Sequence, residues 1–491
     1  MTQAAATTAR SRWLALVVLC AGMLMIILDQ TIVNVALPTI QSDLGFSQSS
    51  LAWVVNAYLI ALGGLLLLAG RIGDLIGRKR IFLAGLAVFT LASLLCGVSQ
   101  SGEMLIAARF VQGIGAAMTS AVILGMIVTM FPEPREQATA IGIYSFVASA
   151  GASIGLLAGG VITQAINWHW IFFVNLPIGI AAAVLALRLV ESDPGVGLRE
   201  GADVAGAALV TTALMLGVYT IVGTVDHGWS SAHTLGFGAA AAVLLAGFVA
   251  RQATARRPLV PLRIFRSRNV SGANVVQTLM VAGMFGMFFL GTLYLQRVLH
   301  YDAVQTGAAF LPVSVGIGAL SLGFSARLIT RLGARAVLLP GLVLLAAGLA
   351  LLTGAPVGGD YVTDVLPAMV LLGVGAGIAF PALVTLAMAG ATASDAGLAS
   401  GLVNTTQQVG GALGLAVLAT LSTSRTNHLL ADGESGASAL TGGYHLAFGI
   451  GAGLVLAAIV VAVAVLRSER ALELDTASQP AVGDTAYSEA A

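Results

Sequence analysis

Charged side chains are scarce in this chain. Lysine, arginine, aspartate and glutamate make up 9% of its 491 residues, and Lys79 is the single lysine. So little charge beside 58% hydrophobic residues excludes an ordinary soluble multidomain protein and indicates a polytopic membrane protein. Cysteine is scarcer still, because only Cys20 and Cys96 occur and both lie within apolar runs. We therefore expect them to be small core residues that form no disulfide.

The sequence also lacks the motifs of common enzymes and of ATP-driven proteins. It contains no metal-ligand spacing, no phosphate-binding Walker loop and no convincing nucleophile–base arrangement. We therefore predict no enzymatic activity, no metal and no cofactor, and we expect no nucleic-acid partner. Without an ATP-binding loop, any uphill transport has to draw on an ion gradient.

Apolar runs recur along the chain at lengths that suit membrane crossing. A span needs about 20 mostly apolar residues, and fourteen segments meet this rule. The first is too long for the core of a signal peptide, so we expect it to be retained. The sequence thus predicts an all-α polytopic membrane protein with 14 transmembrane helices, near residues 13–36, 50–70, 81–99, 103–130, 138–163, 170–189, 203–224, 233–250, 269–295, 304–326, 337–354, 363–389, 397–421 and 444–466.

Basic residues fall in alternate loops. Twenty of the 23 lie at the N-terminus or in every second loop, whereas Arg297 and Arg425 lie in the opposite loops and Arg109 lies in a span. This positive-inside pattern places the protein in the cytoplasmic membrane, within the lipid bilayer, with both termini cytoplasmic. The loop at 251–268 carries six arginines and could lie along the anionic inner leaflet.

The two ends of the chain resemble each other at a nearly constant offset. Gly142, Gly151 and Gly155 in the fifth span match three glycines of the thirteenth span 259 residues later. Parallel six-helix repeats that face each other across a midplane cavity are a transporter architecture. We therefore predict an N-terminal six-helix bundle, an inserted two-helix linker with a basic loop, a C-terminal six-helix bundle and a disordered tail, at 1–190, 191–268, 269–467 and 468–491.

Five motifs carry a more specific resemblance. They are LDQTIVNVALP at 28–38, GRIGDLIGRKR at 70–80, LIAARFVQGIGAA at 105–117, the spaced glycines of 142–160 and WHWIFFVNLPIG at 168–179. Together they resemble the major facilitator superfamily and, within it, the fourteen-span drug:proton antiporters of the EmrB/QacA type. The resemblance implies the major facilitator fold, two parallel six-helix repeats plus two inserted helices, and proton-coupled export by alternating access.

Two of these motifs imply moving parts. The resemblance implies a gating loop between spans 2 and 3, formed by Gly70, Asp74, Gly77, Arg78, Lys79 and Arg80, in which Asp74 faces a helix N-terminus or a nearby arginine and Arg78 can pair with an acid across the bundle. It also implies conformational glycines in span 5 at Gly142, Gly151, Gly155, Gly159 and Gly160, although Leu156 stands where the family usually has proline. The alternatives are a plain positive-inside loop and ordinary close helix packing.

Asp29 and Arg109 are the two charges that lie well inside apolar spans. A charge at a helix centre costs about 2.5–3.5 kcal/mol on insertion scales, so one that persists usually has a partner or a function. Helical rise places Asp29 about 10 Å and Arg109 about 9 Å from the outer ends of their spans. We predict that the two form a proton-coupling pair, the alternatives being a permanently paired carboxylate and a purely structural donor.

Amides and soft apolar side chains are the candidates for a substrate cavity. Methionine and phenylalanine adapt to varied ligands, although packing in the core is the alternative role for each residue. The set predicts a large, amphipathic, lipophilic substrate and consists of Asn34, Gln112, Asn274, Gln277, Met280, Met284, Phe288, Asn404, Gln407 and Gln408.

These observations predict a monomeric exporter that exchanges protons for lipophilic drugs or natural products. The sequence leaves open three rivals: export of one endogenous metabolite or lipid, gradient-driven uptake, and a membrane sensor that transports nothing. The retention of Asp29, Arg109 and Asp74 favours an active exporter over a sensor.

Overall fold

The computed structural model describes residues 2–47, 49–195, 197, 201–389 and 396–467, so the predicted tail at 468–491 lies outside the described residues. Within these ranges the chain forms helices and loops and no strand. Its first half contains α1 (Thr2–Leu44), the 3₁₀ turn η1 (Ser50–Ala52), α2 (Trp53–Ile76), α3 (Arg78–Gly97), α4 (Gly102–Met130), α5 (Pro134–Ala165), α6 (Trp170–Phe173) and α7 (Asn175–Leu189).

An inserted pair of helices separates this half from the second. The pair consists of α8 (Val204–His227) and α9 (Ala232–Thr254), and the 3₁₀ turn η3 (Leu262–Arg266) follows it. The second half contains α10 (Arg268–Arg297), α11 (Ala303–Ala309), α12 (Leu311–Ala319), the π-helical turn η4 (Leu320–Phe324), α13 (Ser325–Leu332), α14 (Ala334–Leu352), the π-helical turn η5 (Tyr361–Val365), α15 (Leu366–Ala389), α16 (Ala396–Ala431) and α17 (Gly436–Val465).

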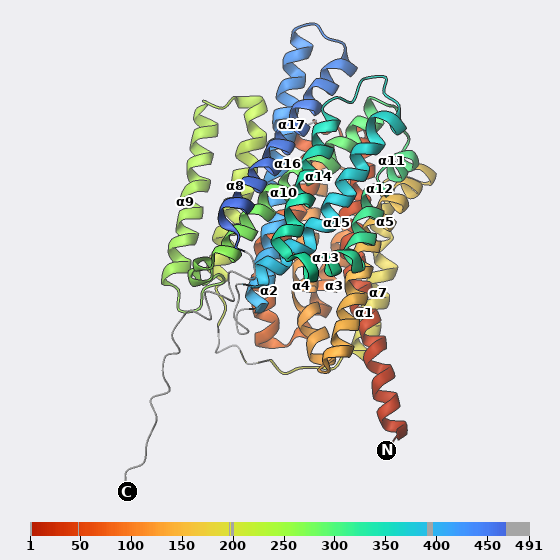
Figure 1. Ribbon diagram of the computed structural model, residues 1–491, viewed down its shortest axis with the longest axis vertical. Coiled ribbons are helices and arrows are strands. Elements are labelled where there is room, and N and C mark those ends of the chain that lie inside the picture. The colour runs from red at the N-terminus through yellow and green to blue at the C-terminus, as the bar shows by residue number, and fades with distance from the viewer. Residues whose placement is uncertain (1, 48, 196, 198–200, 390–395, 468–491) are drawn as a thin grey trace.

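Every predicted span coincides with one helix or with a run of adjoining helices (Figure 1). Among the described residues, eleven helices are long and apolar enough to cross a membrane. The other three predicted spans fall on α5, on the run from α11 to α13 and on α16. The predicted all-α membrane architecture is therefore confirmed.

Two helix ends differ from the predicted span ends. α1 continues past Pro38 to Leu44, eight residues beyond the predicted end, because Ile40 is fully buried and Asp43 accepts a hydrogen bond from Trp168 Nε1 at 2.8 Å. α2 continues to Ile76, so most of the predicted gating loop is helical. The turn to α3 needs only Gly77, whose φ of 103° is strained for any residue with a side chain.

The same type of helix contact recurs in both halves. α5 packs on α1, and a Cβ added at Gly155 would lie 2.9 Å from the Leu28 carbonyl oxygen. α16 packs on α10, and a Cβ at Gly414 would lie 2.8 Å from the Ala282 carbonyl oxygen. Because Gly155 and Gly414 are one of the glycine pairs 259 residues apart, the internal repeat places equivalent glycines at equivalent helix contacts.

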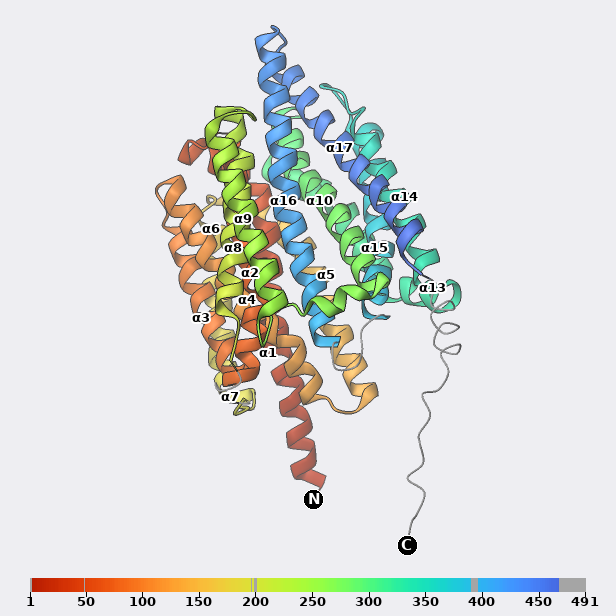
Figure 2. The same ribbon diagram turned by 90° about the vertical axis from the view of Figure 1, so that its left-hand side faces the viewer.

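The two halves meet mainly where α2 packs on α16 and where α5 packs on α11 and α12, and α1 also contacts α10. We call the end of the bundle that carries Arg78, Lys79 and Arg80 the basic end, at the bottom of Figure 1, and the opposite end the far end. The inserted helix α8 packs on both α2 and α16, whereas α9 packs on α8 and stands at the edge of the molecule (Figures 1 and 2).

Candidate transport site

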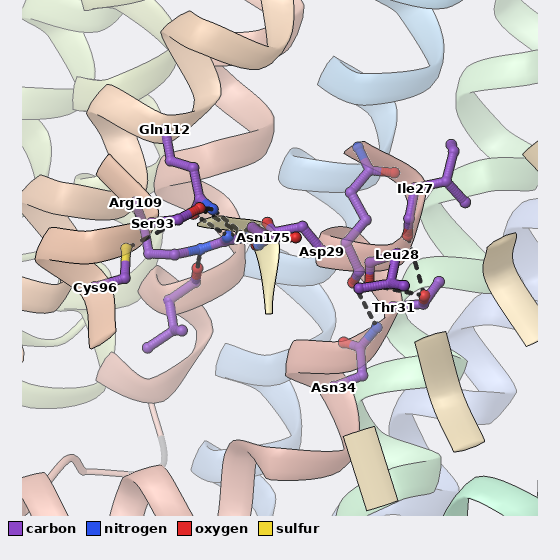
Figure 3. A network of polar contacts seen from close by, with 12 residues as sticks. Ile27, Leu28, Asp29, Thr31, Asn34, Ser93, Cys96, Arg109, Gln112 and Asn175 are labelled. Carbon is purple, nitrogen blue, oxygen red and sulfur yellow. Dashed lines mark hydrogen bonds and ion pairs between the residues drawn. The ribbon is translucent and has the colours of Figure 1, made fainter. Parts of the chain in front are cut away.

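Asp29 on α1 and Arg109 on α4 form a buried ion pair inside the first half (Figure 3). Arg109 Nη1 lies 2.5 Å from Asp29 Oδ2, and the side chains of Arg109 and Asp29 are 1% and 0% exposed. The guanidinium also lies over the Tyr58 ring at 4.3 Å, and its Nε donates to the Val54 carbonyl oxygen at 2.9 Å. The two intramembrane charges therefore neutralise each other in a site closed to solvent, as burial of a charge requires.

Three further side chains complete this polar network, and the sequence analysis assigned two of them no role. Gln112 donates to Asp29 Oδ1 at 2.8 Å and to Ser93 Oγ at 2.7 Å, while its Oε1 accepts from Arg109 at 2.7 Å. Asn175 donates to Asp29 Oδ1 at 3.0 Å and to Ser93 Oγ at 3.3 Å. Asn175 lies in the quoted motif at 168–179, so its polarity in an apolar run was the available signal.

α1 continues eight residues beyond the span end at residue 36 from which the depth of Asp29 was predicted. Asp29 lies fifteen residues before Leu44, about 22 Å along the helix, whereas Arg109 lies seven residues after Gly102, about 10 Å along α4. The two side chains still meet because α1 extends beyond the start of α4 at the far end. The predicted contact is present, although the ends of the two helices are not matched as the predicted span ends were.

A cavity of about 1050 Å³ lies at the basic end, between the two halves. Its wall takes residues from α1, α2, α4, α5, α15 and α16, from the segment after α9, from the start of α3 and from the residue before α8. Asp29 does not belong to the described wall, but its chain neighbour Gln30 does. The wall consists of Met23, Ile26, Ile27, Gln30, Leu62, Leu66, Leu67, Gly70, Arg71, Asp74, Arg78, Ser120, Ala121, Val122, Leu124, Gly125, Val128, Thr129, Ile141, Tyr144, Asp203, Arg257, Pro258, Leu259, Pro261, Met388, Leu398, Ser400, Gly401, Asn404 and Gln408.

The far end is closed by contacts between the halves. Gln296 on α10 donates to the Val35 carbonyl oxygen at 2.9 Å, and Arg297 hydrogen-bonds to Gln41 of α1. At the α5–α11 contact, a Cβ on Gly160 would lie 2.9 Å from the carbonyl carbon of Ala303. The structure therefore combines a cavity at the basic end with a closed far end.

Of the ten residues predicted to line a substrate cavity, Asn404 and Gln408 lie on this wall. Gln112 instead belongs to the Asp29 network, and Asn34 donates to the Gln30 carbonyl oxygen at 3.1 Å. Gln407 is not among the described residues that line the cavity. A polar side chain in a helix can satisfy its hydrogen bonds within its own half, which removes the need to face the cavity.

The α10 members of the predicted set lie away from the wall in the described part of the chain. Asn274 accepts from Thr406 Oγ1 at 2.8 Å, which joins α10 to α16. Met280 and Met284 are buried core residues, and the Phe288 ring lies 5.4 Å from that of Phe310, between centroids. Gln277 is also buried, and neither its Nε2 nor its Oε1 has a hydrogen-bond partner among the described residues. In this conformation these residues therefore pack in the core, which was the alternative role, and do not line the cavity.

The predicted gating residues form a compact cluster where α2 meets α3. Arg78 Nη2 pairs with Asp74 Oδ1 at 2.9 Å, and Arg78 Nη1 donates to the Gly125 carbonyl oxygen of α4 at 3.1 Å. The acid that Arg78 meets is therefore Asp74, one helical turn away, and not an acid across the bundle. Lys79 donates to the Leu187 carbonyl oxygen at 3.0 Å, and Arg80 donates to that of Ile76 at 3.3 Å, whereas Gly70 lies on the cavity wall.

The predicted conformational glycines divide into three groups. A Cβ added at Gly151 or Gly159 would press on α1, as at Gly155. The Cβ added at Gly159 would lie 2.6 Å from the Ile32 carbonyl oxygen. Gly160 faces α11 of the other half, and the adjoining Leu156 carbonyl oxygen would lie 2.5 Å from a Cβ on Gly307. At Gly142 no described atom lies within 4 Å of the added Cβ. Close approach thus explains four of the five glycines but not Gly142.

The buried pair makes a prediction about stability. Replacing Arg109 by Gln leaves the Asp29 carboxylate buried without a counter-charge, which costs about 3–5 kcal/mol when one partner of a buried pair is removed. We expect the free energy of unfolding in detergent to fall by that amount, and Asp29→Asn in the same chain to restore most of it. A double variant as unstable as Arg109→Gln alone would show that the two residues are not energetically coupled.

Comparison with known proteins identifies the fold that holds this site. The family model of the Major Facilitator Superfamily matches residues 19–415. A bacterial homolog of the human lysosomal transporter Spinster, solved in an inward-facing and unoccupied conformation, matches 95% of this chain and 98% of its own with a TM-score of 0.66 at 16% identity. The human organic anion transporter MFSD10 matches 92% of this chain and 99% of its own with a TM-score of 0.61 at 15% identity.

Several relatives are much closer in sequence. The puromycin resistance protein pur8 of Streptomyces alboniger is 39% identical over 475 residues, which cover 95% of this chain and 94% of the relative. The cephamycin export protein CmcT of Amycolatopsis lactamdurans is 37% identical and covers 84% of this chain and 85% of its own. The tetracenomycin C resistance and export protein of Streptomyces glaucescens is 35% identical, covering 86% and 78%. With its helical fold and these relatives, the chain belongs to the Major Facilitator Superfamily and is a multi-pass membrane transporter rather than an enzyme.

Proposed function

We propose that this protein is a proton-driven exporter of lipophilic small molecules, of the fourteen-span drug:proton antiporter type. The observation that carries the proposal is the cavity at the basic end, beside a buried acid–base pair. The excess of arginine at that end supports a cytoplasmic orientation for it and for both termini, in the cytoplasmic membrane. In that orientation the cavity opens on the side from which an exporter takes up its substrate. A monomer suffices, because one chain supplies both halves of the cavity.

The chemistry of the wall supports an amphipathic substrate. Most of the wall surface is apolar, and the amides of Gln30, Asn404 and Gln408 offer hydrogen bonds that carry no net charge. Asp74 and Arg78 on the wall already neutralise each other. Such a surface binds a bulky, largely apolar compound with a few polar groups. The names of two relatives, which concern resistance to puromycin and tetracenomycin C, support the same class.

The energy source we propose is the proton gradient, acting through Asp29. Protonation of this carboxyl removes its charge–charge attraction to Arg109, which weakens the interactions that now join α1 to α4 and α7. Substrate in the cavity touches Gln30, the next residue in the chain, so occupancy and protonation can bias the same helix. The halves then alternate between a closed far end and a closed basic end.

The experiment that tests this function is uptake into everted membrane vesicles from an efflux-deficient host. Puromycin, tetracenomycin C and a lipophilic cationic dye serve as substrates, with vesicles lacking the protein as the baseline. We expect uptake of at least one compound on energisation and its loss when a protonophore collapses the gradient. Uptake that equals the baseline for the whole panel, or that survives the protonophore, would contradict proton-driven export.

Export of a single endogenous product is the second candidate function. It is supported by relatives that are named for one compound, such as the cephamycin export protein. The same vesicle panel separates the two, because a broad exporter carries compounds of several chemical classes and a dedicated exporter carries one. Competition between the panel compounds for uptake is the measurement that decides.

A further inference from the structure

The segment between α9 and α10 lies across the cavity instead of lying free on the membrane surface. We call residues 255–267 the strap; it runs from the end of α9 to the start of α10 (Figure 2). Leu259, Val260 and Ile264 are buried in a small hydrophobic cluster, separate from the main core, whose other members are Leu68 of α2, Ala207 of α8, Val270 of α10 and Ala399 and Leu402 of α16. The strap therefore rests on both halves. This loop was expected to lie along the inner leaflet of the membrane, but only its exposed side chains, Leu262 and Phe265 among them, can do so.

One buried carboxylate organises the strap. Asp203 caps α8 through the Gly206 N–H at 2.9 Å, pairs with Arg251 Nε at 2.5 Å and accepts from Gln252 Nε2 at 2.9 Å. Gln252 Oε1 in turn accepts from the Val260 N–H at 3.0 Å, which fixes the strap backbone. Burial raises the pKa of Asp203, but hydrogen bonds from Arg251, Gly206 and Gln252 outweigh it and lower that pKa below its ordinary value. The carboxylate is thus held charged and fully partnered.

The inserted pair reaches the cavity through this arrangement. Asp203, Arg257, Pro258, Leu259 and Pro261 all lie on the wall, facing the same space as the α1, α2, α4 and α16 residues. Asp203 already has its partners, so the rings of the two prolines and the Leu259 side chain supply the apolar contact surface. Prolines hold their backbone shape at little entropic cost, which suits a fixed wall.

We propose that the strap is one wall of the substrate site and that the inserted pair acts as a specificity element, contacting the apolar part of an amphipathic substrate. This inference rests on the proposed export function. Asp203 and Gln252 are positioning residues in it, because they hold the strap and need not touch the substrate. A substrate that fills the cavity shields Leu259 but leaves Leu262, three residues further along the strap, open.

Protection of single cysteines by puromycin tests the proposal. Cys20 and Cys96 are buried away from the cavity wall, on which Leu259 lies, so Leu259→Cys and its matched control Leu262→Cys are labelled with N-ethylmaleimide against a low background. With puromycin at ten times its Kd, we expect Leu259→Cys to react about tenfold more slowly, following its unoccupied fraction. Leu262→Cys is expected to react at an unchanged rate. Equal rates with and without puromycin at both positions would overturn the assignment.

Enlarging one side chain of the strap provides a second test of the proposal. Leu259→Trp narrows the cavity, whereas Leu262→Trp adds the same volume on an exposed part of the strap. We expect Leu259→Trp to raise the KM for the largest compound of the vesicle panel more than for the smallest, and Leu262→Trp to change neither. A uniform loss for all compounds in both variants would overturn the specificity role.

These outcomes separate the two proposals. Wild-type vesicles that export puromycin, with a Leu259→Cys chain that puromycin does not protect, would remove the strap assignment and leave the export function standing. Wild-type vesicles that export no compound of the panel would remove the export function and the strap assignment together.

Discussion

Asp29→Asn is expected to reduce proton-driven export to the level of vesicles without the protein. Asparagine has the size of the aspartate and still accepts hydrogen bonds, so Gln112 and Asn175 can keep their positions around it. It cannot, however, bind and release a proton near neutral pH. The substitution therefore removes the proposed coupling step while it preserves most of the local packing.

Proteoliposomes provide the measurement. We expect the variant to lose substrate accumulation driven by a pH gradient, and to lose proton release on substrate addition, while exchange of labelled for unlabelled substrate continues. Asp43→Asn is the matched control, because it removes the same charge from the exposed end of α1 and an asparagine oxygen can still accept the Trp168 hydrogen bond. Gradient-driven accumulation in Asp29→Asn at the control level would place coupling elsewhere in the chain.

Gly160→Val is expected to trap the transporter with its far end open. A Cβ at this position would lie 2.9 Å from the Ala303 carbonyl carbon and 2.9 Å from Val304 Cα, and these backbone atoms cannot rotate away. The clash exists only while α5 and α11 are in contact, so it raises the free energy of the conformation described here. Overpacking of about 1–3 kcal/mol shifts the ratio of two states by about 5- to 150-fold.

The rate at which a cysteine at the far end reacts with a maleimide measures this shift. Val35 is fully buried in the closed far end, so Val35→Cys is expected to react slowly with an impermeant maleimide in the parent chain and faster, by that ratio, with Gly160→Val. Export should fall in parallel. Gly142→Val is the control, since no described atom lies near the added side chain, and it should leave both labelling and export unchanged. Equal labelling in both valine variants would show that the α5–α11 contact does not set the closed state.

The features of this protein differ in whether the sequence alone contains the information that is needed to predict them. The all-helical architecture and the Asp29–Arg109 contact were predicted, because apolar runs and two isolated intramembrane charges are visible without knowing how helices pack. Asn175 and Ser93 were missed as members of the network, since one polar residue in an apolar span has many structural explanations. The role of Asp203 was missed as well, because its partners lie 48 and 49 residues further along the chain.

The amides show the limit of sequence reasoning most clearly. Asn274 and Asn404 have similar sequence surroundings, yet Asn274 bonds within the second half and Asn404 lies on the cavity wall. The direction of a helical side chain depends on how the helix is rotated against its neighbours, and a rotation by half a turn exchanges the buried and the cavity face. That rotation is a property of the packed bundle.

Sequence by itself determined the recurring apolar helices, the internal repeat and the need for Asp29 and Arg109 to find partners. The reason is that the cost of placing polar groups in lipid acts on each segment wherever its neighbours lie. Only the tertiary structure decided that the cavity lies at the basic end, that Gly160 rather than Gly142 meets the other half, and that the strap forms part of the wall. These features depend on contacts between residues far apart in the chain, whose free energies nearly balance between the two states of a transporter.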